Sequence, residues 1–168
     1  GALVRYKGET IVKTPMNYNL AIEIAKDIIS VPNCEVLLSG EKTAYIMPKT
    51  EEYLIRMIKV VQYKTTIIKS LDEIQEDILK VSVCDLSGIA NSEKYFVDKW
   101  SDKAAAAVSG DQYMDFMDLC VSKGDALKKV QKIYGIDRSE CMAFGDNYND
   151  CEMLKQAEFS YAMASAAD

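Results

Sequence analysis

The sequence predicts an α/β protein, because two periodicities alternate along it. Segments with apolar residues every three or four positions, typical of amphipathic helices, lie between short apolar runs, typical of strands. The 168 residues include 49% hydrophobic and 27% charged side chains, which is a globular composition, and the length suits one domain or slightly more. No internal repeat, low-complexity tract or proline-rich linker interrupts the pattern.

The first third of the chain predicts two helices separated by a pair of strands. Asn17 and Thr50 each precede a periodic apolar segment and can cap it through a side-chain oxygen. The two strands flank Gly40 to Lys42, as antiparallel strands flank a turn. The expected elements are a helix over residues 18–29, strands over 35–39 and 43–47, and a helix over 51–61.

The middle of the chain continues with the same alternation. Ser70 to Glu73 has the capping-box pattern. Residues 104–108 are rich in alanine, which favours a helix, but pairing with the following apolar run favours a strand. The expected elements are a strand over 78–84, a helix from Asn91 or Ser92 to Trp100, and paired strands over 104–108 and 113–119.

A further amphipathic helix is expected over residues 121–135. Gly135 stands where a C-terminal cap belongs. Lys123 stands near the first turn, where the helix dipole disfavours a cation. It is either a solvated surface charge or a lysine aimed at a phosphate. The apolar stripe of the helix comprises Ala126, Leu127, Val130, Ile133 and Tyr134.

Composition limits the chemistry that the chain can perform. Without histidine there is no Ser–His or Cys–His nucleophile pair and no histidine base, so carboxylates and lysines remain. The net charge of −6 argues against a nucleic-acid surface. Five cysteines without CxxC spacing predict reduced, mostly buried thiols. The lack of a signal peptide or membrane-length apolar run predicts a cytoplasmic protein without a membrane partner.

The most informative segment is Met142–Asp150. An apolar run, expected as a buried strand, ends at Gly145, and a helix-like segment follows Asp150. Open α/β sheets bind ligands at the carboxyl ends of their strands, and oxygen ligands favour Mg²⁺. The pattern alone equally fits a polar loop in which Asp150 caps the next helix. The oxygen-bearing side chains between the two elements are Asp146, Asn147, Asn149 and Asp150.

Together, Ser122–Gly124 and Gly145–Asp150 resemble the C-terminal half of the haloacid dehalogenase superfamily, and most closely its Cof-type phosphatases. The two segments occur in the family's order and at a family-like spacing. The resemblance implies that Lys123 steadies the phosphate and the nucleophilic aspartate, and that Asp146 binds Mg²⁺. It also implies that Asn149 contacts the phosphate or orients Lys123, and that Asp150 supports the water shell of the metal.

The resemblance also implies a domain organisation. The opening segment, Gly1–Lys13, resembles a hairpin that follows the third core strand of the family, and the middle of the chain resembles its α/β cap. The implied architecture is a partial Rossmann-like core, residues 1–14 and 120–168, with an inserted α/β cap, residues 15–119. Candidate substrate-facing residues of this cap, for which solvated surface is the commoner role, are Lys42, Tyr45, Tyr63 and Lys64.

The chain departs from the family pattern in two places. The family's DxDGT motif, which carries the aspartate nucleophile, does not occur in these 168 residues. The turn that often carries an NA dipeptide in relatives has Ser165–Ala166 instead. We therefore expect part of a Mg²⁺-dependent phosphatase that acts on a small phosphorylated metabolite through an aspartyl-phosphate. Without the nucleophile segment, the 168 residues alone should be inactive and should bind Mg²⁺ weakly.

Two other functions stay open. One is a phosphorylation-domain fragment of a P-type ATPase, whose family shares a GDGxND loop, although the DKTGT motif and a membrane span are absent here. The other is a non-catalytic module that binds a ligand. The apolar strand at Met142–Phe144 is also expected to have an open edge, which predicts fast hydrogen exchange in residues 121–168 or pairing with a second copy.

Overall fold

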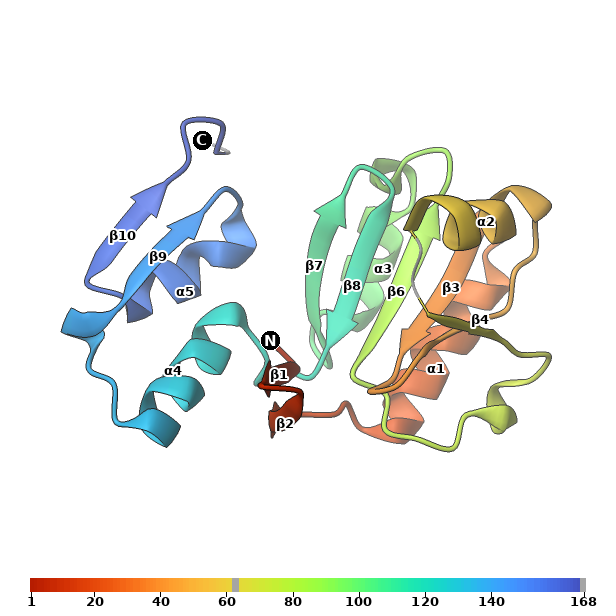
Figure 1. Ribbon diagram of the computed structural model, residues 1–168. Helices are drawn as coiled ribbons and strands as arrows, with labels where there is room; N and C mark the ends of the chain where they lie inside the picture. The colour runs from red at the N-terminus through yellow and green to blue at the C-terminus, as the bar shows by residue number, and fades with distance from the viewer. Residues whose placement is uncertain (62–63, 167–168) are drawn as a thin grey trace. The chain divides into compact units, whose positions relative to one another are not determined.

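The computed structural model describes residues 1–61 and 64–166, so the candidate Tyr63 lies outside the described residues. The chain divides into two compact units (Figure 1). Unit 1 combines Gly1–Thr14 with Cys120–Asp168, and unit 2 is the continuous segment Pro15–Leu119. Helices and strands alternate in both units, and the predicted mixed α/β class is confirmed.

Unit 2 is built on a six-stranded sheet with the order β5-β4-β3-β6-β8-β7. The neighbouring strands are antiparallel except β4 and β5, which are parallel. The strands are β3 (Cys34–Ser39), β4 (Ala44–Ile46), β5 (Thr65–Ile67), β6 (Lys80–Asp85), β7 (Ala105–Gly110) and β8 (Tyr113–Met117). The helical segments are α1 (Tyr18–Ser30), α2 (Glu51–Ile55), the π-helix η1 (Arg56–Val61), α3 (Glu93–Trp100) and the 3₁₀ turns η2 (Leu71–Glu73) and η3 (Ile89–Asn91).

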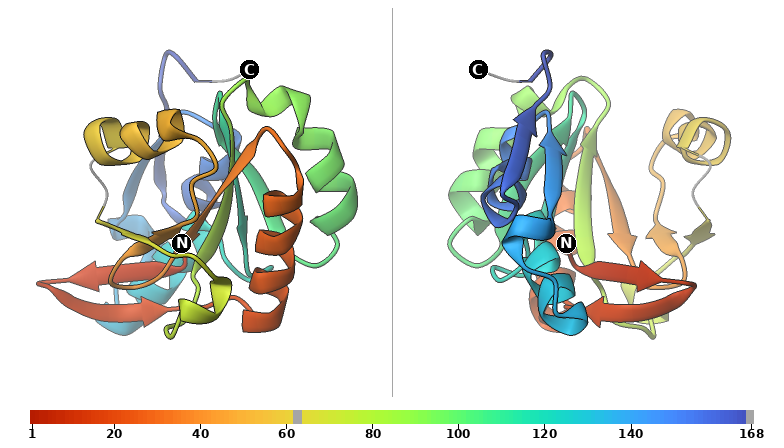
Figure 2. Two further views of the ribbon diagram at one scale, coloured as in Figure 1. Left: turned by 90° about the vertical axis from the view of Figure 1, so that its right-hand side faces the viewer. Right: turned by 60° about the vertical axis from the view of Figure 1, so that its left-hand side comes forward.

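Helices α1 and α3 cover one face of this sheet (Figures 1 and 2). Because strand side chains alternate between faces, one set of strand residues packs against these helices and the next set faces the opposite way. The core on the helix side includes Val36, Leu38, Val81, Val83 and Phe116, all of which are buried. The predicted caps are confirmed, because Asn17 accepts from the Leu20 N–H and Thr50 accepts from the Tyr53 N–H.

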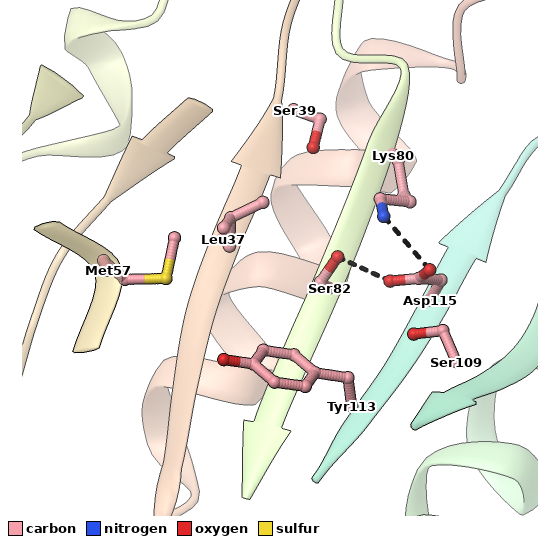
Figure 3. A pocket seen from close by; sticks show the side chains of 8 residues that line it. All are labelled: Leu37, Ser39, Met57, Lys80, Ser82, Ser109, Tyr113 and Asp115. Carbon is pink, nitrogen blue, oxygen red and sulfur yellow. Dashed lines mark hydrogen bonds and ion pairs between the residues drawn. The ribbon is translucent and has the colours of Figure 1, made fainter. Parts of the chain in front are cut away.

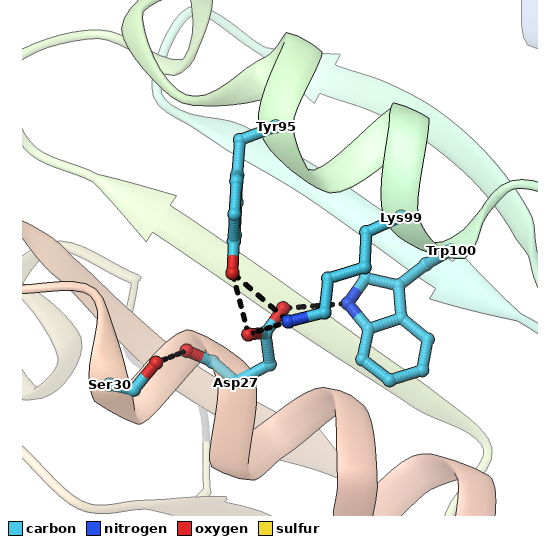
Figure 4. Close-up of polar contacts among 5 residues, drawn as sticks. All are labelled: Asp27, Ser30, Tyr95, Lys99 and Trp100. Atoms are coloured by element: carbon cyan, nitrogen blue, oxygen red, sulfur yellow. Dashed lines mark hydrogen bonds and ion pairs between the residues drawn. The ribbon is translucent and has the colours of Figure 1, made fainter.

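The carboxylate of Asp27 joins α1 to α3 (Figure 4). It accepts from Lys99 Nζ at 2.5 Å, Trp100 Nε1 at 2.7 Å and the Tyr95 hydroxyl at 2.8 Å. Burial alone would raise the pKa of Asp27, but these three hydrogen bonds outweigh it and hold the pKa below its usual value. The buried charge is therefore satisfied, and it fixes the register of the two helices.

Helix α2 is shorter than the sequence predicted. It ends at Ile55 and continues as the π-helix η1, whereas the expected α-helix extended to Val61. On the sheet face away from α1 and α3, Tyr53 and Met57 form a second buried cluster with Ile46 and Cys84. This face of the sheet is therefore partly covered by α2 and η1.

Unit 1 contains a hairpin, a parallel pair of strands and two helices. Strands β1 and β2 form the hairpin, and β9 and β10 are parallel. Helix α4 begins at Lys123, and Gly135 caps it in the left-handed conformation, as expected. The elements are β1 (Leu3–Tyr6), β2 (Glu9–Lys13), α4 (Lys123–Tyr134), the 3₁₀ turn η4 (Arg138–Glu140), β9 (Met142–Gly145), the 3₁₀ turn η5 (Tyr148–Asp150), α5 (Cys151–Gln156) and β10 (Phe159–Ala162).

The expectation of a buried strand at Met142–Gly145 is right for only one face of β9. Met142 and Phe144 are 59% and 56% exposed, whereas the alternate residues Ala143 and Gly145 are buried. Successive side chains of a strand point to opposite faces, and the face of Gly145 is the one that Asp150 and Leu154 approach. Phe144 stacks on Tyr161, with ring centroids 5.3 Å apart. The strand is therefore apolar on both faces but buried on one.

Burial was also overestimated elsewhere in unit 1. On α4, Ile133 and Tyr134 are 51% and 44% exposed, although Ala126 of the same stripe is buried. Of the five cysteines, only Cys34 and Cys84 are buried, and burial raises the pKa of both thiols. Among the described helices, none is both long and apolar enough to cross a membrane.

Candidate active site

The loop after β9 is organised by the carboxylate of Asp150. Its Oδ2 accepts from the backbone N–H of Asp146 at 3.0 Å and from that of Asn147 at 3.4 Å. The Asn147 side chain in turn accepts from the Tyr148 N–H at 2.7 Å. Asp150 is 3% exposed, so these bonds form in a desolvated position. The conformation of the loop after β9 is therefore fixed by Asp150, the last residue of the loop.

Lys123 contacts the same carboxylate. Its Nζ makes a very short ion pair with Asp150 Oδ1 and lies 3.4 Å from Asn149 Oδ1. The ammonium is placed by helix α4, where Ser122 caps the first turn by accepting from the Asp125 N–H at 2.9 Å. The structure thus brings Lys123 together with Asn149 and Asp150, which lie 26 and 27 positions later in the sequence.

The pKa of Asp150 lies below its usual value. The hydrogen bond from Lys123 is the largest cause, and the backbone N–H groups of Asp146 and Asn147 add to it, while burial opposes them. Asp150 is therefore ionised at neutral pH. Its two oxygens are engaged by the lysine on one side and by the loop backbone on the other.

Two glycines allow this close arrangement. A Cβ at Gly124 would lie 2.4 Å from the Glu152 carbonyl oxygen, so α4 approaches α5 more closely than any side chain permits. A Cβ at Gly145 would lie 2.6 Å from the Cβ of Asp150. Each glycine directly neighbours a site residue, Lys123 or Asp146, which explains why the motifs read Lys-Gly and Gly-Asp.

Asp146 differs from Asp150 in being exposed. It follows the carboxyl end of β9, and its backbone, rather than its carboxylate, is bound by Asp150. Within the described part of the chain, no group of three His, Cys, Asp or Glu residues is arranged to hold a metal ion. Mg²⁺ is commonly held by one or two carboxylates together with waters and substrate phosphates, so an exposed aspartate fits this ion in donor type and number.

The predicted substrate-facing residues of unit 2 have other partners. The Tyr45 hydroxyl donates to Glu76 Oε1 at 2.8 Å, and burial and this carboxylate raise the pKa of Tyr45 to about 12. The Lys42 N–H also bonds Glu76, and the Lys64 carbonyl accepts from Thr43. None of Lys42, Tyr45 and Lys64 lines either of the two principal cavities that the described residues form.

One of these cavities was missed from the sequence. It occupies about 210 Å³ on the sheet of unit 2 (Figure 3). A signal was present, because Lys80 and Ser82 alternate with Val81 and Val83, and Asp115 stands between Met114 and Phe116. Polar residues alternating with apolar ones place a polar row on the sheet face opposite the core. The lining residues are Leu37, Ser39, Met57, Lys80, Ser82, Ser109, Tyr113 and Asp115.

The fold is that of a haloacid dehalogenase-like hydrolase. The family with this description matches residues 1–168, and the chain belongs to it. The family predicted from the two motifs is confirmed.

Individual relatives are phosphatases by name. The chain is 26% identical over 168 residues to the 5-amino-6-(5-phospho-D-ribitylamino)uracil phosphatase YbjI of Escherichia coli, covering 99% of this chain and 62% of the relative. Among solved structures, SMU.1108c from Streptococcus mutans superposes with a TM-score of 0.81 at 29% identity, covering 99% of this chain and 64% of that one. The sugar phosphatase BT4131, of HAD subclass IIB, shares the fold with a TM-score of 0.81 at 15% identity, covering 99% and 63%. The chain thus spans somewhat less than two thirds of the length of these proteins.

Proposed function

We propose that this chain forms part of a Mg²⁺-dependent phosphatase that hydrolyses a small phosphorylated metabolite through an aspartyl-phosphate. The observation that carries the proposal is the convergence of Lys123, Asn149 and Asp150 beside the exposed Asp146. A phosphoryl group is recognised by fixed positive charge and hydrogen-bond donors, and phosphoryl transfer depends mainly on positioning and electrostatic stabilisation.

Each residue has a distinct role in this proposal. Lys123 binds phosphate oxygens through its ammonium, and its side chain is 46% exposed although it is paired with Asp150. Asn149 orients this ammonium or contacts the phosphate through its amide. Asp146 would hold the metal, and Asp150 would support its water shell. Mg²⁺, when bound, neutralises charge on the phosphoryl oxygens.

The attacking carboxylate is not among these residues. Asp150 is engaged by Lys123 and the loop backbone, Asp146 is assigned to the metal, and the DxDGT pattern does not occur in the 168 residues. In the proposed reaction, a carboxylate oxygen forms the bond to phosphorus while the bond to the leaving alcohol breaks. Water then hydrolyses the acyl phosphate.

The names of the relatives support a small, hydroxylated substrate. The Escherichia coli relative is named for a phosphoribityl compound, and BT4131 is named as a sugar phosphatase. Both names describe phosphate esters of polyhydroxylated carbon chains. We include a cytoplasmic location in the proposal, because phosphorylated metabolites of this kind do not cross membranes unaided.

Hydrolysis of p-nitrophenyl phosphate tests the proposal. The 168-residue chain should show no more than trace activity with Mg²⁺, whereas the chain extended at its N-terminus by a family segment carrying DxDGT should turn over. In the extended protein, Lys123→Ala should reduce kcat/KM by about 100-fold or more, because it removes a preorganised charge from the phosphate site.

Lys128→Ala is a matched control, because Lys128 is an exposed lysine of the same helix and should leave the rate unchanged. An extended, folded protein that binds phosphate but never hydrolyses it would instead identify a binding module. Substantial turnover by the 168 residues alone, lost in Lys123→Ala, would overturn the assignment of the nucleophile.

A further inference from the structure

The cavity of unit 2 is built from one polar row across three strands. Leu37, Ser82 and Asp115 are register partners on β3, β6 and β8, and Ser39 is the partner of Lys80. Because all five belong to the strand positions that alternate with the buried core, they share the sheet face away from α1 and α3. Figure 3 shows their side chains converging on the cavity.

The floor of the cavity is a hydrogen-bonded trio. Asp115 Oδ1 accepts from the Ser82 hydroxyl at 2.6 Å, and Asp115 Oδ2 accepts from Lys80 Nζ at 3.0 Å. The Asp115 side chain is 12% exposed and that of Lys80 is 35% exposed, so both remain accessible from the cavity. No strand needs this polar trio for its backbone pairing, and the charges lie over a half-buried face where apolar residues would be the ordinary choice.

This trio offers a ligand a paired donor and acceptor. The ammonium has further N–H groups, and the carboxylate oxygens have further lone pairs, within about one hydrogen-bond length of each other. A hydroxyl on one carbon can donate to the carboxylate while a hydroxyl on the next carbon accepts from the ammonium. The pair is neutral overall, so neither an anion nor a cation is favoured. The matching ligand group is an uncharged vicinal diol.

The remaining walls suit the carbon chain of such a ligand. Leu37, Met57 and the ring of Tyr113 supply apolar contacts, and Ser39 and Ser109 supply further hydroxyls. Drug-sized ligands occupy pockets of about 300–1,000 Å³, so a cavity of about 210 Å³ fits a smaller group. A short polyol or a monosaccharide combines the required size, hydroxyl pattern and apolar C–H faces.

We propose that this cavity is a binding site for a small polyhydroxylated group, in which Lys80 and Asp115 form hydrogen bonds with a vicinal diol. Binding of a polyol in this cavity of unit 2 is independent of the proposed phosphatase function.

The test is an NMR titration of the ¹⁵N-labelled 168-residue chain with ribitol, and with pentane-1,5-diol as a probe of equal carbon number without vicinal hydroxyls. Ribitol should produce saturable shifts centred on Ser82, Ser109 and Asp115, and pentane-1,5-diol should not. Asp115→Asn should weaken ribitol binding about tenfold, because it removes a hydrogen bond to a charged group.

Two further variants keep the test decisive. Ser109→Phe fills the cavity from an exposed strand position without touching the trio, and should also abolish the ribitol shifts. Asp98→Asn removes an exposed carboxylate of α3, paired with Lys94, and should leave ribitol binding unchanged. Equal response to both probes, undiminished binding in Asp115→Asn and Ser109→Phe, or no saturable shift at about 100 mM ribitol would overturn the proposal.

The outcome is separable from that of the phosphatase assay. Ribitol binding without hydrolysis in the extended protein would retain the cavity assignment and reject the proposed function. Hydrolysis without ribitol binding would retain the proposed function and reject the cavity assignment.

Discussion

At the scale of single residues, two aspartates of one loop in the candidate site differ in burial and in hydrogen bonding. Asp150 is buried, and its oxygens are bound by Lys123 and by the loop backbone. Asp146 is exposed, and only its N–H is bound by Asp150. The carboxylate that organises the loop is therefore separate from the carboxylate that is available to a metal ion.

The ionised state of Asp150 should make unit 1 sensitive to acid. Because the folded pKa is depressed, its stabilising contribution is present above the unfolded pKa of about 3.9 and is lost as the pH falls through the lower folded pKa. Asp150→Asn should lower the free energy of unfolding by about 1–2 kcal/mol at pH 7, towards the low end because Lys123 is half exposed. The difference should vanish once the pH has fallen through the depressed folded pKa of Asp150, and chemical denaturation at several pH values measures it. A difference independent of pH would contradict this role.

At the scale of elements, packing is set by close approaches and by one buried charge. Gly124 lets α4 meet α5, and Gly145 lets β9 meet Asp150, so two glycines define where the site can form. In unit 2, Asp27 ties α1 to α3 through three donors (Figure 4). A buried carboxylate with three partners fixes helix register more specifically than an apolar contact would.

Removing the Asp27 carboxylate should destabilise unit 2. Asp27→Ala leaves Trp100 Nε1 without its acceptor and removes hydrogen bonds to a charged group, so we expect a loss of about 2–3 kcal/mol in the free energy of unfolding. Fluorescence of Trp100, the only tryptophan, follows urea unfolding of this unit. The control Asp98→Ala breaks the exposed pair with Lys94 and should cost about 0.5 kcal/mol or less. Equal effects of the two variants would contradict a stabilising role for the Asp27 hydrogen bonds.

At the scale of the whole molecule, local patterns predicted most of the helices and strands, whereas burial required tertiary information. Asn17, Thr50 and Gly135 marked helix ends correctly because caps are local hydrogen bonds. The convergence of Lys123 with Asn149 was implied only by the family resemblance, because no spacing rule reports a contact across more than twenty residues. The strand of Phe144 was predicted to be buried from its apolarity alone, but Phe144 lies on the exposed face of that strand.

The cavity residues were missed for a related reason. Lys80, Ser82 and Asp115 belong to different strands, and only the antiparallel register brings Ser82 opposite Asp115. The alternation within each strand predicts which face a residue occupies, but not which strands are neighbours.

The two units should differ in hydrogen exchange. Unit 2 buries two apolar clusters around its six-stranded sheet, whereas unit 1 exposes Met142, Phe144 and Phe159 on a two-stranded sheet. Amides of residues 15–119 should therefore resist exchange, and those of 121–168 should exchange faster or be protected by dimerisation. Exchange mass spectrometry at several protein concentrations, with light scattering, separates the two cases. Uniformly strong protection in a strict monomer would contradict the open edge.

In the proposed site, Asp146 binds the metal ion while Asp150 holds Lys123, and the Mg²⁺ dependence of hydrolysis distinguishes these two roles. In the protein extended by a DxDGT segment, Asp146→Asn should raise the Mg²⁺ concentration for half-maximal hydrolysis of p-nitrophenyl phosphate by about tenfold or more, because it removes a carboxylate ligand. Asp150→Asn should chiefly lower kcat and thermal stability, because it releases Lys123 and the loop. An unchanged Mg²⁺ requirement in folded Asp146→Asn, or a larger shift in Asp150→Asn than in Asp146→Asn, would contradict the account.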